Sequence, residues 1–220
     1  MKSSILVAFL LVAFVSNAGA EELSGIPTIV DGDTIDLQDI RIRLHGIDAP
    51  EAGQTCKTTE GRSWKCGEAA MDRLVSLVEH GITCNLTGAD RYDRWIAVCH
   101  QADGTDINRV MVEEGYAWAF RRYSDDYASV EETAKVLKTG IWQSDTTSPW
   151  DYRAERWAAA EQEAVDGCPI KGNISKAGQI YHTPWSPWYS RTRIRLEDGE
   201  RWFCTEREAI DAGWRAPVWR

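Results

Sequence analysis

Apolar and polar residues alternate in several short segments of the chain, which is the pattern of strands with one buried face. The alternation is strict at 40–44, and an Asp-Gly turn at 31–32 precedes another such segment. Strands are predicted at 26–30, 34–37, 40–44, 82–86 and 95–99. Five strands with helices inserted and appended favour an α+β fold built on a small closed barrel, and they argue against a doubly wound parallel sheet.

Other segments carry apolar residues at helical spacing or between helix-capping residues and glycines. The segment 68–78 places its apolar residues on one helical face. Further helices are predicted after the capping residues Asp106, Ser129, Ser148 and Thr205. Their expected ends are Gly115, Gly140, Gly167 and Gly213. The helix after Ser148 is rich in alanine and glutamate, and we interpret it as a connector.

The first 20 residues have the features of a secretory signal peptide. Lys2 precedes an apolar run at 5–15, and small residues end at Ala20, where we expect cleavage. The run is too short for a permanent membrane span, and no later segment reaches the required ~20 apolar residues. We therefore expect an exported bacterial protein, periplasmic or secreted, without a membrane span. The expected divisions are a signal peptide at 1–20, a barrel domain at 21–145, a connector at 146–167 and a mini-domain at 168–220.

Six cysteines form an even set in a chain expected to be exported, so disulfides are predicted. Cys84 and Cys99 lie symmetrically about the 90–93 turn, where antiparallel strands would place them opposite each other. Proximity along the chain then pairs Cys56 with Cys66 and Cys168 with Cys204. A zinc site of Cys168, His182 and Cys204 is an alternative, although it has only three ligands and lacks the paired spacing of structural zinc sites.

The segment from 168 onward differs in composition from the rest. It gathers Trp185, Trp188, Trp202, Trp214 and Trp219, which we interpret as the core of a small disulfide-stapled module. Arg191, Arg193 and Arg195 alternate on a predicted strand. A solvated strand face is the favoured interpretation of these arginines, and contact with phosphates or an acidic polymer is the alternative.

Charge is distributed unevenly between the two parts of the chain. Residues 21–167 hold 15 basic and 28 acidic side chains, whereas residues 168–220 hold 9 and 6. An acidic main domain does not attract polyanions over long range, which counts against tight nucleic-acid binding. It does not exclude catalysis on a nucleic acid, because a bound cation and local arginines change the field at the phosphate.

Three stretches, 30–34, 43–51 and 90–94, carry the candidate chemistry. Each has an ordinary structural interpretation as a turn, a strand exit or a surface arginine. Together they are more specific, because two strand-end turns in one barrel would place Asp33 and Asp48 side by side at one rim. Adjacent carboxylates repel, and a hard cation such as Ca²⁺ would remove that conflict.

The order of these motifs resembles the thermonuclease, or staphylococcal nuclease-like, family over about 26–142. The resemblance implies a five-stranded oligonucleotide/oligosaccharide-binding (OB-fold) β-barrel with three helices. It also implies that Ca²⁺ is the cofactor and that Asp33, Asp48 and the backbone carbonyl of Ala49 bind it. By the same resemblance, the catalytic residues are Arg43, Glu51 and Arg94. Glu51 would orient or deprotonate the attacking water, and the two arginines would bind the scissile phosphate.

Substrate contacts are expected from Arg91, Tyr92 and Tyr123, with ordinary surface roles as the alternative. Asp93 stands where the family usually has glycine and adds a negative charge near the phosphate, and Arg121 stands where an aromatic residue is typical. The C-terminal stretch resembles a small module of bacterial exported proteins, sometimes called a sunset domain, for which no chemistry is expected.

The favoured function is an exported Ca²⁺-dependent nuclease that cleaves DNA and RNA with little sequence preference and leaves 3′-phosphates. Single-stranded nucleic acid is the expected partner, and the sequence indicates no obligate protein partner. One alternative is a non-catalytic barrel that binds an anionic oligosaccharide or envelope polymer. A structural envelope protein whose C-terminal module docks a partner is the third hypothesis.

Overall fold

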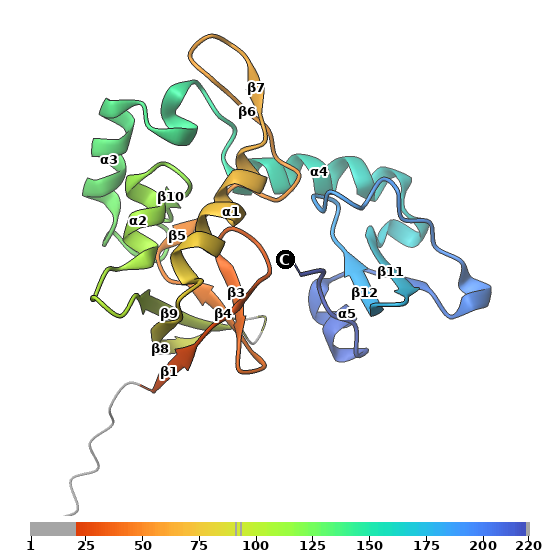
Figure 1. Ribbon diagram of the computed structural model, residues 1–220. Helices are drawn as coiled ribbons and strands as arrows, with labels where there is room; N and C mark the ends of the chain where they lie inside the picture. The colour runs from red at the N-terminus through yellow and green to blue at the C-terminus, as the bar shows by residue number, and fades with distance from the viewer. Residues whose placement is uncertain (1–20, 91, 93, 219–220) are drawn as a thin grey trace, which may run out of the picture.

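A curled six-stranded sheet forms the first part of the computed structural model, which describes residues 21–90, 92 and 94–218 (Figure 1). The strand order is β1-β8-β9-β4-β3-β2, and the pairing is antiparallel except between β4 and β9. These strands are β1 (Glu22–Gly25), β2 (Thr28–Ile29), β3 (Thr34–Leu37), β4 (Ile40–Leu44), β8 (Ile82–Ala89) and β9 (Trp95–His100). The expected signal peptide, Arg91, Asp93 and Trp219 lie outside the described residues.

The α+β fold class predicted from the sequence is confirmed, and β3 and β4 have the predicted bounds. Between them, Gln38 and Asp39 have φ values of 52° and 65°, the left-handed backbone of a tight hairpin turn. The sheet also contains β1, which was not predicted, and it pairs with β8 through Leu23 opposite Cys84. Short pairs complete this part: β5 (Ile47–Asp48) with β10 (Trp118–Ala119), and β6 (Cys56–Lys57) with β7 (Ser63–Trp64).

Helices pack around the sheet and close its core. They are α1 (Cys66–Val78), α2 (Ile107–Glu113), α3 (Ala128–Leu137) and the short 3-10 helix η1 (Gly140–Gln143). The apolar face of α1 contributes Met71 and Leu74, which are fully buried with Ile35 and Ile42 of the sheet. Asp106 caps α2 as expected, because its side chain accepts from the backbone N–H of Arg109.

The predicted capping box at Ser129 is wrong. The N-cap position of α3 lies two residues earlier, at Tyr127, whose side chain makes no capping bond, and the helix begins at Ala128. Tyr127 is buried, and its hydroxyl donates to Asp106 Oδ2 at 3.1 Å. Burial of this tyrosine fixes the start of the helix in place of a serine cap.

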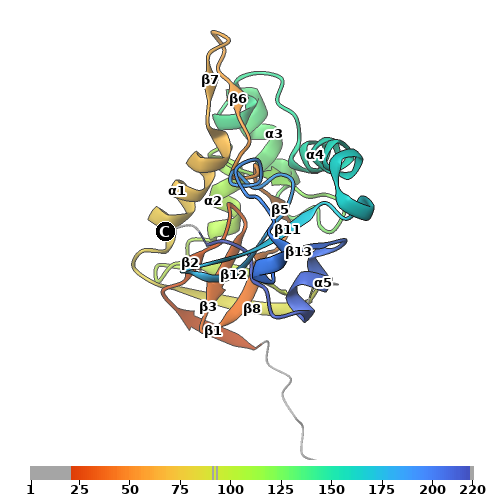
Figure 2. The ribbon, with the colours of Figure 1, turned by 90° about the vertical axis from the view of Figure 1, so that its right-hand side faces the viewer.

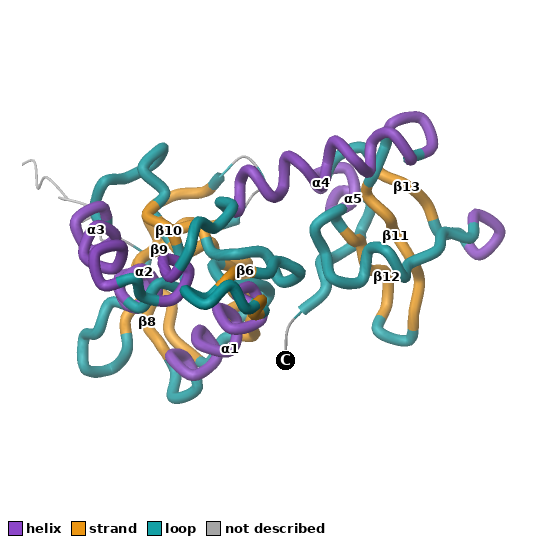
Figure 3. Tube along the Cα trace, turned by 90° about the horizontal axis from the view of Figure 1, so that it is seen from above, coloured by secondary structure: helices purple, strands orange, loops and turns teal. Residues whose placement is uncertain are grey.

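The connector helix α4 (Pro149–Glu163) runs from the barrel to the C-terminal module, as the view from above shows (Figure 3). The predicted cap is confirmed, because Ser148 accepts from the N–H of Asp151. The short helix η2 (Val165–Gly167) follows α4. None of the described helices combines the length and apolar character needed to cross a membrane.

The C-terminal module is a three-stranded sheet in the order β12-β11-β13, with one short helix against it (Figure 2). Its elements are β11 (Ile170–Ser175), β12 (Gly178–His182), η3 (Leu196–Asp198), β13 (Arg201–Phe203) and α5 (Glu206–Asp211). The predicted cap of α5 at Thr205 is confirmed. The buried core holds Ile170, Tyr181, Phe203, Ala209 and Trp214, so Trp214 alone of the described tryptophans at 185, 188, 202 and 214 is fully buried there.

The predicted strand through Arg191, Arg193 and Arg195 is wrong. Hydrogen-bonded turns cover 188–192, where the N–H groups of Arg191 and Thr192 donate to the carbonyl of Trp188, and η3 follows. Local turns satisfy the backbone here, so the arginines lie on a loop.

All three predicted disulfides are present: Cys56–Cys66, Cys84–Cys99 and Cys168–Cys204. The alternative zinc site at Cys168, His182 and Cys204 is therefore wrong, since the two sulfur atoms bond each other. His182 instead forms hydrogen bonds with Asn173 at 3.0 Å and Ser186 at 3.3 Å.

Candidate active site

Arg43 brings the two predicted metal-binding aspartates together. Its guanidinium lies 3.1 Å from Asp33 Oδ1 and 3.3 Å from Asp48 Oδ1. The pairing of β3 with β4 explains this position, because Thr34 lies opposite Arg43 and Leu44 donates to the carbonyl of Asp33. Both aspartates therefore lie against one guanidinium, and their assignment as metal ligands stays a prediction.

Asp33 is held on several sides and is only 4% exposed. Oδ1 also accepts from the Thr34 hydroxyl at 2.9 Å, and Oδ2 accepts from the backbone N–H of Ala49 at 3.1 Å. Burial by itself would raise the pKa of Asp33, but the charge of Arg43 and hydrogen bonds hold the pKa below its ordinary value. Asp33 is therefore an ionised carboxylate in a nearly dry position.

Asp31 adds a carboxylate that the sequence interpretation treated only as part of the turn. Its Oδ1 accepts from the backbone N–H of Asp33 at 3.1 Å. Burial and the neighbouring Asp33 raise the pKa of Asp31 to about 7. The sequence motif could have indicated this additional carboxylate, since Asp31 and Asp33 flank one glycine.

Glu51 lies close to the same cluster, at the exit from β5. Burial raises its pKa to about 8, although the charge of Arg153 acts in the opposite direction. The loop after it is tightly packed, because a Cβ on Gly67 at the start of α1 would overlap the carbonyl oxygen of Glu51. Gly67 thus allows α1 to pass directly beneath the candidate base.

Arg153 is a second residue of this cluster that the sequence did not indicate. It comes from α4 and donates to Asp48 Oδ1 at 3.1 Å, Asp48 Oδ2 at 2.8 Å and Glu51 Oε1 at 2.6 Å. Its position 105 residues from Asp48 gave no local signal. The packing of α4 against the barrel creates the contact.

Arg94 is oriented by Asp90. Asp90 Oδ2 accepts from Arg94 Nε at 2.9 Å and lies 2.7 Å from Nη2, and its Oδ1 accepts from the N–H groups of Tyr92 and Arg94. The charge of Arg94 also acts on Asp33 and lowers the pKa of that carboxyl. Tyr92 lies under the guanidinium, with 5.4 Å between Arg94 Cζ and the ring centroid. The predicted arginine pair is thus near one carboxylate cluster.

Tyr123 is 69% exposed and packs on Phe120, with 5.1 Å between their ring centroids. Phe120 in turn packs on Trp150 of α4 at 5.6 Å. Arg121 donates to Glu132 at 3.0 Å. The structure places Tyr123 on an aromatic surface beside α4, so its assignment to substrate binding stays a prediction.

The donors of this cluster fit a hard cation in their chemistry. Asp33 and Asp48 are 4% and 0% exposed, and their oxygen atoms face the positive groups Arg43 and Arg153. Within the described ranges no group of three or more His, Cys, Asp or Glu side chains is arranged to hold a metal ion. Two carboxylates, a backbone carbonyl and waters can complete a Ca²⁺ shell, because this ion accepts six to eight oxygen ligands.

Comparisons with known proteins divide the chain into two matches. Residues 41–144 match the family model described as staphylococcal nuclease homologue, a range that includes Arg43, Asp48, Glu51 and Arg94. Residues 150–216 match a model described as ArfC. The second match begins in α4, so it includes Arg153 and the C-terminal module.

Several relatives are about one-third identical to this chain over the residues that align with it. The succinoglycan biosynthesis protein ExoI of Rhizobium meliloti (strain 1021) is 37% identical over 131 residues, 57% of this chain and 67% of that protein. A micrococcal nuclease of Shigella flexneri is 33% identical over 166 residues, 67% of this chain and 90% of that protein. An uncharacterized endonuclease of Escherichia coli O157:H7 is 33% identical over 133 residues, with coverage of 57% and 80%.

Proposed function

The chain belongs to the staphylococcal nuclease homologue family, and we propose that it is an exported Ca²⁺-dependent nuclease. It hydrolyses phosphodiesters of DNA and RNA with little sequence preference and prefers single strands. The relatives that are named as nucleases support the nuclease function itself. They do not favour a non-catalytic barrel, and the family match spans Arg43, Glu51 and Arg94.

The observation that carries this proposal is the convergence of Asp33 and Asp48 on Arg43, at 3.1 and 3.3 Å, with Glu51 joined to the same cluster. Buried carboxylates are costly unless they are paired or bind a metal. A phosphodiesterase needs this combination of oxygen donors, a water-orienting carboxylate and guanidinium groups. The cluster therefore supports phosphoryl chemistry better than passive binding.

Each residue has a distinct part in the proposed reaction. Arg43 and Arg94 bind the non-bridging oxygens of the phosphate, where their forked donors stabilise the growing negative charge. Glu51 accepts the proton of the attacking water or orients that water toward phosphorus. The water oxygen forms the new bond, the bond from phosphorus to the 5′-oxygen breaks, and the departing oxygen takes up a proton. The products are a 3′-phosphate and a 5′-hydroxyl.

Ca²⁺ held by Asp33, Asp48 and the Ala49 carbonyl would polarise a phosphoryl oxygen as a Lewis acid. The Ala49 N–H donates to Asp33 Oδ2, which holds the Asp48–Ala49 peptide beside the carboxylate. A positive charge near Glu51 also lowers its pKa from about 8 and favours the ionised form that the reaction needs.

Export and domain organisation belong to the same proposal. Three disulfides support an oxidising location, where such bonds persist. We propose the barrel at 21–145, the connector at 146–167 and the mini-domain at 168–220 as the functional divisions. The acidic barrel supports modest rather than tight affinity for nucleic acid.

Cleavage of a labelled single-stranded oligonucleotide by residues 21–220, in Ca²⁺ and in excess chelator, tests the proposal. We expect cleavage in Ca²⁺ alone and a loss of about 10²–10³ in rate for Glu51→Gln. Product ends are read by polymerase extension before and after phosphatase treatment, since a 3′-phosphate blocks extension. No cleavage in Ca²⁺ would overturn the enzyme assignment, and extendable products would overturn the product assignment alone.

A further inference from the structure

Arg153 places a positive charge on the oxygen atoms that a cation would need. One guanidinium contacts both oxygens of Asp48 and Oε1 of Glu51, at 2.6–3.1 Å. Asp48 is fully buried, whereas the Arg153 side chain is 26% exposed. A guanidinium is always charged in a protein, and the two carboxylates that Arg153 contacts stabilise that charge. The guanidinium therefore acts as a cation supplied by the chain itself.

The start of α4 is fixed to the barrel, which explains why Arg153 reaches the cluster. Gln54 Nε2 donates to the carbonyl of Thr147 at 2.6 Å, directly before the Ser148 cap. Trp150 packs on Phe120 at 5.6 Å and on Trp118 at 6.3 Å. Two anchors thus precede Arg153 by less than two helical turns.

A hard divalent cation binds carboxylate oxygens directly, at ~2.4 Å. Arg153 contacts both oxygens of Asp48 and Arg43 lies 3.3 Å from Oδ1, so a further positive charge beside them would be repelled. Binding of Arg153 and of the cation to Asp48 is therefore competitive. By reciprocity, a cation that weakens the Arg153 contact also weakens the docking of α4.

We propose that Arg153 is an intramolecular counter-cation that holds the site in a cation-free form and that a divalent cation displaces. This inference rests on the proposed function, because it assumes that Asp48 is a cation ligand. It assigns to the connector helix a part in setting the cation concentration at which the barrel becomes active.

Arg153→Gln removes the charge, and Arg156→Gln is the matched control on the same helix. Arg156 is exposed and stacks on Tyr152, with 5.1 Å between Cζ and the ring centroid. Calorimetric titration of full chains with Ca²⁺ measures affinity without any need for cleavage. We expect Arg153→Gln to bind Ca²⁺ at least about ten-fold more tightly, since the competing charge is gone, and Arg156→Gln to match the parent chain.

Thermal unfolding with and without Ca²⁺ gives a second readout. Without Ca²⁺, Arg153→Gln should unfold at a lower temperature, because Glu51 loses its arginine and Asp48 keeps only Arg43. Saturating Ca²⁺ should raise its unfolding temperature by more than it raises that of the parent chain. Hydrogen exchange should become faster in 149–163 of the parent chain when Ca²⁺ binds.

Equal or weaker Ca²⁺ affinity in Arg153→Gln, with unchanged exchange in α4, would overturn this inference and leave the nuclease proposal standing. Absence of Ca²⁺ binding in every variant would overturn the Ca²⁺ part of the proposed function itself. If Arg153→Gln does not fold, Arg153→Lys keeps the charge but loses the bidentate contact, and an intermediate gain in affinity is expected. Unchanged affinity in Arg153→Lys would then overturn the inference.

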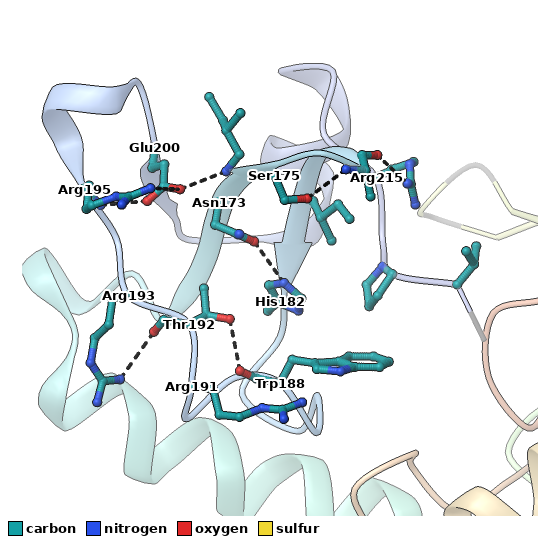
Figure 4. A pocket seen from close by; sticks show the side chains of 15 residues that line it. Asn173, Ser175, His182, Trp188, Arg191, Thr192, Arg193, Arg195, Glu200 and Arg215 are labelled. Atoms are coloured by element: carbon teal, nitrogen blue, oxygen red, sulfur yellow. Dashed lines mark hydrogen bonds and ion pairs between the residues drawn. The ribbon is translucent and has the colours of Figure 1, made fainter. Parts of the chain in front are cut away.

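A separate observation concerns a cavity of about 580 Å³ in the C-terminal module. Figure 4 shows Arg191 and Arg193 on the loop along one side, His182 on β12 and Trp188 at the lower edge. Arg215 lies at the other end of the cavity. Cationic groups beside aromatic rings are the usual lining of sites for single-stranded nucleic acid.

The described lining of the cavity holds more basic than acidic side chains, because four arginines line it and Glu200 is its one carboxylate. Arg193 and Arg215 donate to backbone carbonyls, at 2.7 Å to Ser190 and 2.8 Å to Ala177. In the part of the chain that the structure describes, no carboxylate forms an ion pair with Arg191, Arg193 or Arg215. Arg195 differs, because Asp198 lies 2.7 Å from its Nε.

The C-terminal module lies beside the barrel, because Gly53, two residues after Glu51, lies close to the carbonyl of Trp185. The cavity itself is lined by residues of the module. We infer that this cavity binds the phosphodiester backbone of a substrate flank, outside the cleaved bond. The inference rests on the proposed function for its ligand class.

Fluorescence anisotropy with labelled oligothymidylate in chelator tests this binding in full chains. Arg191→Glu/Arg193→Glu is compared with Arg62→Glu/Arg109→Glu, which makes the same change in net charge on exposed barrel residues. We expect the first variant to lose at least about ten-fold in affinity and its salt slope to fall by about 1.4, as for two lost contacts to a single strand. The control should lose much less.

Equal losses in both variants, or none, would overturn the cavity assignment. Retained oligothymidylate affinity together with lost affinity for an acidic polysaccharide would assign the cavity to a different ligand class. If Ca²⁺-dependent cleavage is absent while the cavity variant alone loses binding, the nuclease proposal fails and the cavity assignment stands.

Discussion

The backbone N–H of Ala49 donates to Oδ2 of Asp33 at 3.1 Å and ties two motifs that lie 16 residues apart. The bond fixes the carboxylate of the first motif against the peptide that follows Asp48. Gly32 makes this close approach possible, since a Cβ at that position would lie 2.6 Å from the Ala49 side chain. The two turns therefore form one rigid unit.

Asp33→Asn removes the negative charge and keeps an acceptor for the Ala49 N–H. We expect Ca²⁺ affinity to fall and the cleavage rate to drop by about 10²–10³, measured by calorimetry and initial rates. Asp39→Asn is the control, because Asp39 lies on an exposed turn at φ 65°, where asparagine is well tolerated. Loss of activity in Asp39→Asn of the same size would contradict the assignment.

Asp90 positions Arg94 through two contacts of 2.9 and 2.7 Å, so Asp90→Asn should loosen the guanidinium. We expect a loss of roughly ten-fold in kcat, smaller than the loss of about 10²–10³ for Arg94→Ala. Single-turnover kinetics separate this effect from substrate binding. Glu113→Gln, which removes an exposed partner of Arg109, should leave kcat unchanged. An Asp90→Asn rate equal to the parent rate would show that Asp90 does not position Arg94.

Removal of the Cys84–Cys99 disulfide should destabilise the barrel. The bond joins opposite residues of β8 and β9 with a sequence separation of 15. Loop-closure entropy predicts that Cys84→Ala/Cys99→Ala lowers the free energy of unfolding by roughly 3 kcal/mol. Urea unfolding followed by fluorescence measures the loss, and an unchanged midpoint would contradict the prediction.

His182 should make stability depend on pH. Burial and the nearby Lys171 lower its pKa to about 4, whereas an unfolded chain has a pKa of about 6.5. As pH falls, the unfolded chain takes up the proton first. The contribution of neutral His182 to the free energy of unfolding is therefore full above about pH 6.5 and is lost progressively toward pH 4. Each unit by which the folded and unfolded pKa values differ corresponds to about 1.4 kcal/mol in the free energy of unfolding.

His182→Gln should flatten this part of the stability profile, measured by urea unfolding between pH 4 and pH 7. His80→Gln is the control, because the His80 side chain is 93% exposed. A steep profile that survives in His182→Gln would assign the pH dependence to other groups.

Local patterns predicted much of the fold. Alternation at 34–37 and 40–44 gave β3 and β4 with their observed bounds, because each strand buries one face. The cap at Ser148 depends only on a bond to Asp151, three residues away, and it was also predicted. The start of α3 was not, because the buried Tyr127 outweighs the local signal of Ser129.

The candidate site shows the same difference between contacts that local sequence predicts and contacts that it does not. Asp33 and Arg43 meet through the register of neighbouring strands, which sequence order constrains strongly. Arg153 meets Asp48 through the docking of a helix 105 positions away, and no local pattern encodes that contact. At 191–195 the local pattern predicted a strand that does not form. The arginines alternate as they would on a strand, but turns satisfy the hydrogen bonds of the backbone there.

The six cysteines pair in the order in which they occur along the chain, first with second, third with fourth and fifth with sixth. A polypeptide oxidised from its N-terminus onward can close each bridge before the next thiol appears. Such an order requires no shuffling of wrong pairs and no disulfide isomerase. Export of the chain from cells that lack a disulfide isomerase should therefore still yield the three native bridges.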